Sequence, residues 1–209
     1  MKQSFKLFTF KGAPVELSIW FFLIFLIAPF SWSIIIFISV LIHEMAHAFV
    51  ADRRGWRVFG IRIDIFSGSA SIDSNIHGLD SIAVVAAGPL SNLILSIASL
   101  FLITIFELNG YSQDGLLIDI LNQFFTANLI MFLFNILPIY PMDGGRILKD
   151  FLFIKMNNRK LAKKISGSVS LVFSLGLLIY SSITFSLVLI ILSLLFIYLS
   201  LKEVDIITD

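Results

Sequence analysis

The stretch LIHEMAHAF, residues 41–49, lies in the middle of an apolar run that extends from about Trp32 to Asp52. A run of roughly 20 apolar residues is long enough to cross a lipid bilayer as a helix. His43, Glu44 and His47 would then stand at membrane depth, where an ionisable side chain is costly and usually marks a functional site. What these three side chains bind therefore determines the function of the protein.

The composition of the whole chain supports a membrane protein. Of its 209 residues, 58% are hydrophobic and only 14% are charged, whereas a soluble domain is about 45–50% apolar. We therefore expect an integral membrane protein in contact with the lipid bilayer. There is no basic tract interleaved with aromatic residues, so nucleic acid is not an expected partner. The chain has no cysteine, so a metal ion would have to be held by His, Asp or Glu.

Apolar runs and one alternating segment predict the fold. Six apolar runs predict six transmembrane helices, at about residues 15–30, 32–52, 81–106, 121–140, 165–180 and 184–201. Between the second and third runs, residues 57–73 alternate with a period of two and contain a Ser67-Gly68 turn, which predicts a small membrane-associated β-hairpin. The expected fold is an all-α polytopic membrane protein with this hairpin, built as a single domain over residues 1–209.

The positive charges predict the orientation in the membrane. All 15 Lys and Arg residues fall at the N-terminus, after the second run, around the connection of the fourth to the fifth run, or after the sixth run. By the positive-inside rule, both termini are then cytoplasmic. His43 would lie about 14 Å inward from Asp52 at a helical rise of about 1.5 Å per residue. The expected site is inside the membrane and opens toward the cytoplasm.

The spacing within residues 43–47 favours a zinc site. His43 and His47 are four residues apart, so on a helix they share a face and could hold one zinc ion. Glu44 is about 100° round the helix, in a position to act as a general base toward water at the metal. A catalytic zinc takes three protein ligands, so a third must come from elsewhere. His77 is not a good candidate, because its polar surroundings predict a solvated loop histidine.

Asp143 is the better candidate for the third ligand. Pro138 and Pro141 interrupt the fourth apolar run just before it, and a Gly-Gly pair follows it, so we expect the helix to unwind there. Unwound backbone at membrane depth is tolerated where it is buried in protein or lines a water-filled cavity. An interfacial ion pair of Asp143 with Arg146 is the alternative that the sequence leaves open.

Three motifs occur in order along the chain: HEMAH at residues 43–47, GPLSN at 88–92 and NILPIYPMDGG at 135–145. Together they resemble the site-2 protease family of intramembrane zinc metalloproteases. The resemblance is closest to the bacterial sporulation type, which processes a membrane-tethered pro-sigma factor. It covers about residues 11–155 and is weak in the last two apolar runs.

This resemblance implies a metalloendopeptidase that hydrolyses a peptide bond of a membrane-tethered protein substrate. His43, His47 and Asp143 would bind Zn²⁺, and Glu44 would be the general base. The 57–73 hairpin would lie beside the active site and pair with an extended substrate.

Three further residues receive candidate roles from the same resemblance. Asn92, Asn135 and Pro141 are candidates for binding the substrate or stabilising the oxyanion. For the two asparagines, hydrogen bonding between membrane helices is the alternative.

Some properties of the resembling proteins are not expected in this chain, and other functions stay open. Sporulation-type relatives commonly carry a C-terminal CBS domain and other branches a PDZ domain, and the sequence predicts neither. A zinc-binding membrane chaperone without proteolytic activity and a metal transporter remain as alternatives. The expected location is a bacterial cell membrane. A regulatory membrane partner and a homo-oligomer are both compatible with the sequence.

Overall fold

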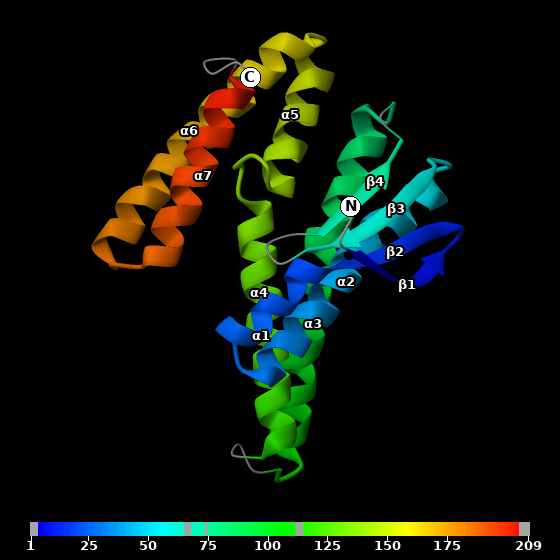
Figure 1. The fold of residues 1–209 in the computed structure, drawn as a ribbon, viewed down its shortest axis with the longest axis vertical. Coiled ribbons are helices and arrows are strands. Elements are labelled where there is room, and N and C mark those ends of the chain that lie inside the picture. Colours follow the sequence, from blue (N-terminus) through cyan, green and yellow to red (C-terminus); the bar gives the residue numbers. More distant parts are fainter. Residues whose placement is uncertain (1–3, 65–67, 74, 112–114, 205–209) are drawn as a thin grey trace. The chain divides into compact units, whose positions relative to one another are not determined.

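The computed structural model describes residues 4–64, 68–73, 75–111 and 115–204 (Figure 1). The chain forms two compact units. The first consists of Met1–Ile76 and Ala87–Phe132, and the second consists of His77–Ala86 and Leu133–Asp209.

The first unit is built around α2 (Phe30–Arg53), which carries the HEMAH motif. It also contains most of α3 (Gly78–Leu108) and most of α4 (Leu116–Ile136). These three helices confirm the second, third and fourth predicted apolar helices. Buried polar side chains connect them, with Asn128 of α4 donating to Ser39 of α2 at 3.0 Å.

A four-stranded sheet completes the first unit (Figure 1). Its strands are β1 (Ser4–Phe10), β2 (Ala13–Ser18), β3 (Val58–Ile63) and β4 (Gly68–Ile72), in that spatial order. The central pair, β2 and β3, is parallel, and the two outer pairs are antiparallel. Strands β3 and β4 confirm the predicted hairpin, whose connecting residues 65–67 lie outside the described residues.

The predicted first membrane helix, at about residues 15–30, is wrong. The segment begins as β2 and continues as two short helices, η1 (Ile19–Leu23) and α1 (Ile24–Ile27). Val15 and Leu17 are buried while Glu16 between them accepts a hydrogen bond from Ser4 at 2.9 Å, which is the period of two of a strand. The apolar residues that remain, 19–27, are too few to cross a bilayer.

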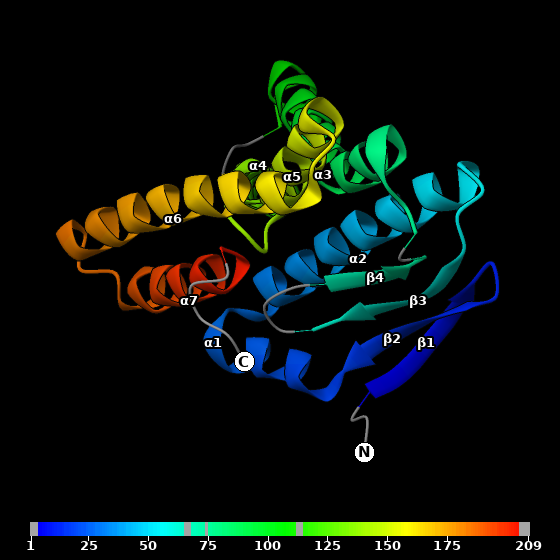
Figure 2. The ribbon, with the colours of Figure 1, turned by 90° about the horizontal axis from the view of Figure 1, so that it is seen from above.

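The sheet packs against α2 in the half of the helix that carries the motif. Figure 2 shows β3 and β4 running alongside α2. Ile61 of β3 is buried in a cluster with Ala48, and Met45 packs against that cluster. Lys11, in the β1–β2 turn, forms an ion pair with Asp52 in the last turn of α2. Strand pairing and helix packing thus hold the sheet beside residues 43–47.

The second unit contains α5 (Asp143–Met156), α6 (Arg159–Ile183) and α7 (Leu187–Glu203). Helix α4 ends at Ile136 and α5 begins at Asp143, so the helix break predicted from the prolines is confirmed. Serines connect this break to the last two helices. Ser170 of α6 accepts from the backbone N–H of Tyr140 at 2.7 Å and bonds the hydroxyl of Ser200 of α7 at 2.6 Å.

Four helices in the described residues are long and apolar enough to cross a membrane: α2, α3, α4 and α6. They support an integral membrane protein. The predicted total of six spans is not confirmed, because residues 15–30 do not form one helix and α7 is not among the four. At 17 residues, α7 stands at the lower limit of the roughly 17–25 residues that a transmembrane helix needs.

Candidate metal centre

Helix α2 brings His43, Glu44 and His47 together inside the first unit. Their side chains are buried, with 4%, 5% and 6% of their surface exposed. One potential metal-binding atom from each of the three lies within 4.8 Å of those of the other two. The helical spacing read from the sequence therefore produces the grouping that it predicted.

The two imidazoles have a geometry that suits a single metal ion. Nε2 of His43 and Nε2 of His47 lie 3.1 Å apart, with the ring planes at 85°. Two nitrogens bound to one tetrahedral zinc at about 2.0–2.1 Å would be separated by about 3.3 Å. The donor pair of α2 therefore fits zinc with little adjustment of either ring.

Gly88 of α3 leaves the space in front of these two nitrogens open. A Cβ at this position would stand 2.6 Å from Nε2 of His43 and would also overlap Nε2 of His47. Both contacts are shorter than van der Waals packing allows. The backbone of α3 thus approaches the histidine pair as closely as a glycine permits, and the space that an ion would occupy depends on the missing side chain.

Strand β4 lies directly against the general-base candidate. A Cβ at Gly68 would overlap the Cγ, the Cδ and a carboxylate oxygen of Glu44. The hairpin that the sequence predicted is therefore beside Glu44. In the described part of the chain, β4 stands at the edge of the sheet, since only β3 pairs with it.

Asn92 of α3 contacts the first histidine. Its Oδ1 lies 2.5 Å from Nδ1 of His43, and its Nδ2 donates to Oδ1 of Asn128 on α4 at 2.8 Å. Asn92 and Asn128 are both completely buried. The structure thus shows hydrogen bonding of Asn92 between helices, and a role of Asn92 toward the substrate stays a prediction.

The other predicted site residues belong to the second unit. Asp143 is buried at the first position of α5, with a carboxylate oxygen 3.8 Å from a guanidinium nitrogen of Arg146. Asn135 lies in the last turn of α4, and Pro141 is exposed in the segment before α5. Metal binding by Asp143 and substrate binding by Asn135 and Pro141 stay predictions.

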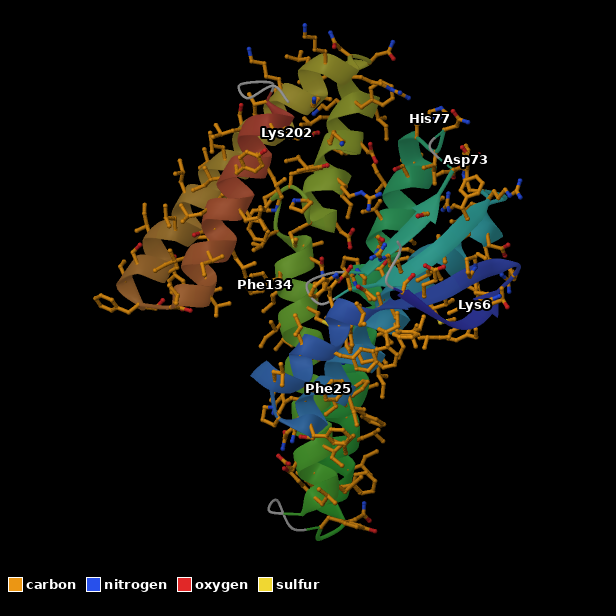
Figure 3. All side chains as sticks on the ribbon, viewed as in Figure 1. Lys6, Phe25, Asp73, His77, Phe134 and Lys202 are labelled. Carbon is orange, nitrogen blue, oxygen red and sulfur yellow. The ribbon has the colours of Figure 1, made fainter. Side chains whose placement is uncertain are left out.

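His77 is not a member of the group of potential metal-binding side chains on α2. It is exposed at the N-terminal end of α3 (Figure 3). The group found among the described residues is made by His43, Glu44 and His47 without it. This agrees with the loop histidine predicted from the sequence.

Three residues of the site escaped the sequence reasoning: Gly68, Gly88 and Asn128. Each had a signal. A glycine inside an apolar helix costs about 1 kcal/mol relative to alanine, which calls for a packing reason. An asparagine such as Asn128 in an apolar run calls for a buried hydrogen-bond partner.

Comparison with known protein families gives matches over most of the chain. Residues 17–136 match the model described as peptidase M50B-like, and residues 102–180 match that of peptidase family M50. A zinc metalloprotease of Methanocaldococcus jannaschii is 31% identical over 219 residues, which cover 97% of this chain and 61% of the relative. Stage IV sporulation protein FB of Bacillus subtilis is 31% identical over 140 residues, which cover 65% of this chain and 45% of the relative.

The chain therefore spans less than two thirds of the length of these curated relatives. Among solved structures, it resembles the site-2 protease from Methanocaldococcus jannaschii with a TM-score of 0.70 and 28% sequence identity. That match covers 99% of this chain and 97% of the other. The resemblance carried by the three sequence motifs is confirmed by sequence and by fold.

Proposed function

The chain belongs to peptidase family M50, the site-2 protease family, and on this basis we propose that it is an intramembrane zinc metalloprotease. It hydrolyses a peptide bond of a membrane-tethered protein substrate. The observation that carries the proposal is the buried group of His43, Glu44 and His47, with its donor atoms within 4.8 Å of one another on an apolar helix. Ionisable side chains inside a membrane-spanning helix usually mark a functional site.

Zinc is the metal that suits the residues present. The chain has no thiolate to offer, and the two Nε2 atoms are spaced for a tetrahedral ion in the space that Gly88 leaves open. His43 and His47 would hold it, with Asp143 as the third ligand by its place in the matching motif. When bound, zinc supplies Lewis acidity, which makes water easier to deprotonate and the scissile carbonyl more electrophilic.

Glu44 moves the proton in this mechanism. Its carboxylate accepts a proton from the attacking water and passes it to the nitrogen of the leaving amine. A carboxylate oxygen of Glu44 lies within 4.8 Å of a ring nitrogen of each histidine, so the base stands beside the atoms that would hold the metal. Because Glu44 is 95% buried, its carboxylate works in surroundings that exclude bulk water.

Strand β4 presents the substrate. A helical peptide has its carbonyl groups bonded within the helix, so the scissile segment must be extended before attack. An extended peptide that adds to the open edge of β4 gains backbone hydrogen bonds and lies next to Glu44, which β4 already contacts at Gly68. Asn135 and Pro141 are the residues we assign to further contacts with this peptide.

The sporulation-type motifs suggest the substrate and the orientation. A membrane-tethered pro-sigma factor is the first candidate, and the identity to a sporulation protein of Bacillus subtilis supports testing it first. The distribution of Lys and Arg supports a bacterial cell membrane with both termini and the opening of the site on the cytoplasmic side.

Replacing Glu44 tests this function. We expect Glu44→Gln to keep its shape and its zinc but to lose cleavage, because an amide cannot accept the proton. Losing a general base lowers rates by roughly 10²- to 10⁴-fold. The measurement is co-expression of wild type or Glu44→Gln with candidate single-span membrane proteins, with the released fragments identified by mass. Cleavage by Glu44→Gln at the wild-type rate would contradict the mechanism.

The same experiment tests the chaperone alternative, and a measurement of zinc flux tests the transporter alternative. A chaperone would retain bound substrate without producing fragments, and a transporter would carry zinc across proteoliposome membranes.

A further inference from the structure

A chain of hydrogen bonds leads away from His43 through the interior of the first unit. Nδ1 of His43 meets Oδ1 of Asn92 at 2.5 Å, and Nδ2 of Asn92 donates to Oδ1 of Asn128 at 2.8 Å. Nδ2 of Asn128 donates to the hydroxyl of Ser39 at 3.0 Å and to the backbone carbonyl of Phe124 at 2.8 Å. Asn92, Asn128 and Ser39 are each 0% exposed. The chain therefore links α2, α3 and α4 by direct hydrogen bonds between side chains.

The carbonyl of Phe124 gives this chain a direction. A carbonyl oxygen can only accept, so the NH₂ end of Asn128 must face it. The oxygen of Asn128 then faces Asn92, which requires the NH₂ end of Asn92 on that side. The oxygen of Asn92 is left facing His43, and an oxygen at that place requires a proton on Nδ1.

The direction of the chain determines which nitrogen of His43 can bind a metal. A neutral imidazole with its proton on Nδ1 has its lone pair on Nε2. Nε2 is the atom that faces His47 at 3.1 Å and the space beside Gly88. A reversed asparagine pair would place an NH₂ group against Nδ1 and move the ring proton to Nε2, where it would block the metal.

We propose that Asn92 and Asn128 are positioning residues that fix the tautomer of His43, so that its Nε2 lone pair faces the metal. The proposal rests on the zinc site proposed above. Asn92 acts on His43 directly, and Asn128 acts only through Asn92. Neither residue needs to touch the substrate.

A second hydrogen bond between α3 and α4 joins the helices without leading to His43, and it serves as a comparison. Ser96 of α3 donates to the carbonyl of Phe125 on α4 at 3.4 Å, so this partly buried bond also joins α3 to α4. This bond does not involve a histidine, and it can form with either tautomer of His43. Ser96 is therefore the matched control for Asn92 and Asn128.

The test measures zinc affinity rather than activity. The full-length protein is purified with Asn92→Leu, Asn128→Leu, both changes, or Ser96→Ala, and its zinc dissociation constant is determined by competition with a chelator. Leucine has the same branching and the same number of side-chain heavy atoms as asparagine, but it cannot form a hydrogen bond. We expect Asn92→Leu to weaken zinc binding by about 10- to 100-fold, the usual effect of losing the partner of a metal-bound histidine.

The double variant supplies the decisive comparison. We expect Asn128→Leu to weaken zinc binding several-fold in the wild-type background and to have no further effect once Asn92 is leucine, because both act along one chain. Ser96→Ala should bind zinc as the wild type does. If a leucine variant does not fold, the alanine variants at Asn92 and Asn128 take its place in the same cycle.

Each result has one meaning. Wild type that fails to bind zinc would overturn the proposed function. Wild type that binds zinc, together with unchanged affinity in Asn128→Leu or additive losses in the double variant, would overturn the positioning role and leave the proposed function standing. An equal loss in Ser96→Ala would show a general weakening of the helix packing and would also overturn it.

Discussion

Gly88→Ala adds one methyl group at the point where α3 meets the histidine pair. The new Cβ would stand 2.6 Å from Nε2 of His43 and would overlap Nε2 of His47, so both rings must turn away from the space between them. Forcing an extra carbon into a packed site costs about 1–3 kcal/mol. Because each 1.4 kcal/mol is a factor of ten in affinity, zinc binding should weaken by about 5- to 150-fold.

The metal-free fold should tolerate the same change. Alanine is favoured over glycine inside a helix by up to about 1 kcal/mol, an advantage that Pro89 reduces because its ring crowds the Cβ of the residue before it. The clashing atoms are the ends of side chains rather than backbone, so the rings can move. The assay is therefore chelator competition for zinc, with thermal unfolding of the metal-free protein measured in parallel. Gly176→Ala in α6 is the control, because a Cβ there meets no atom within 4 Å. Wild-type zinc affinity in Gly88→Ala would refute the metal site beside α3.

Three further variants test the third zinc ligand, the placement of the general base and the stability of the second unit. Asp143→Ala should lower the zinc content of the purified protein, whereas Asp150→Ala should not; equal zinc content in both would exclude Asp143 as a ligand. Gly68→Ala should displace Glu44, the proposed general base, and slow cleavage by about 10²-fold while zinc is retained. Gly60→Ala is the control and should cleave normally, because the added carbon makes an ordinary contact at 3.5 Å. Ser170→Ala should lower the free energy of unfolding by about 0.6–1.7 kcal/mol, because two hydrogen bonds to its hydroxyl are lost; an unchanged unfolding curve would show that these bonds contribute nothing to stability.

The parts of the fold that follow from local pattern were predictable. His43 and His47 share a helix face because their spacing matches the helical period, and this depends on nothing distant in the chain. The alternation that buries Ile61 and Ile63 identified β3, and the prolines marked the end of α4. In each case the deciding feature is a helical period, a strand period or the missing N–H of a proline, and each of these depends only on residues close together in the chain.

The first apolar run was misread because its structure depends on a distant partner. Val15 pairs with Ile61 of β3, which lies 46 residues further along the chain, so the neighbour that makes this segment a strand is not local. Such a strand, followed by a short apolar helix, has nearly the composition of a membrane span. Glu16 was the residue that indicated the alternation of a strand, because it lies between the buried residues Val15 and Leu17.

The surroundings of the histidines were hidden for a related reason. Helix packing decides which residue of α3 lies against His43, and a one-turn shift would replace Gly88 with another side chain. The sequence showed that Gly88 and Asn92 share a motif, and their spacing of four places both on the face that meets α2. That Asn128 of α4 completes the contact could not be read from any local pattern.

Hydrolysis in reconstituted membranes is the most direct test of zinc-dependent proteolysis with Glu44 as the base. Purified wild type and Glu44→Gln, each loaded with zinc, are incubated in proteoliposomes with a membrane-tethered substrate in water enriched in ¹⁸O, and the fragments are examined by mass spectrometry. We expect wild type to release a fragment whose new carboxyl terminus contains ¹⁸O and Glu44→Gln to release none. Intact substrate with zinc-loaded wild type, or the same labelled fragment from Glu44→Gln, would contradict this mechanism.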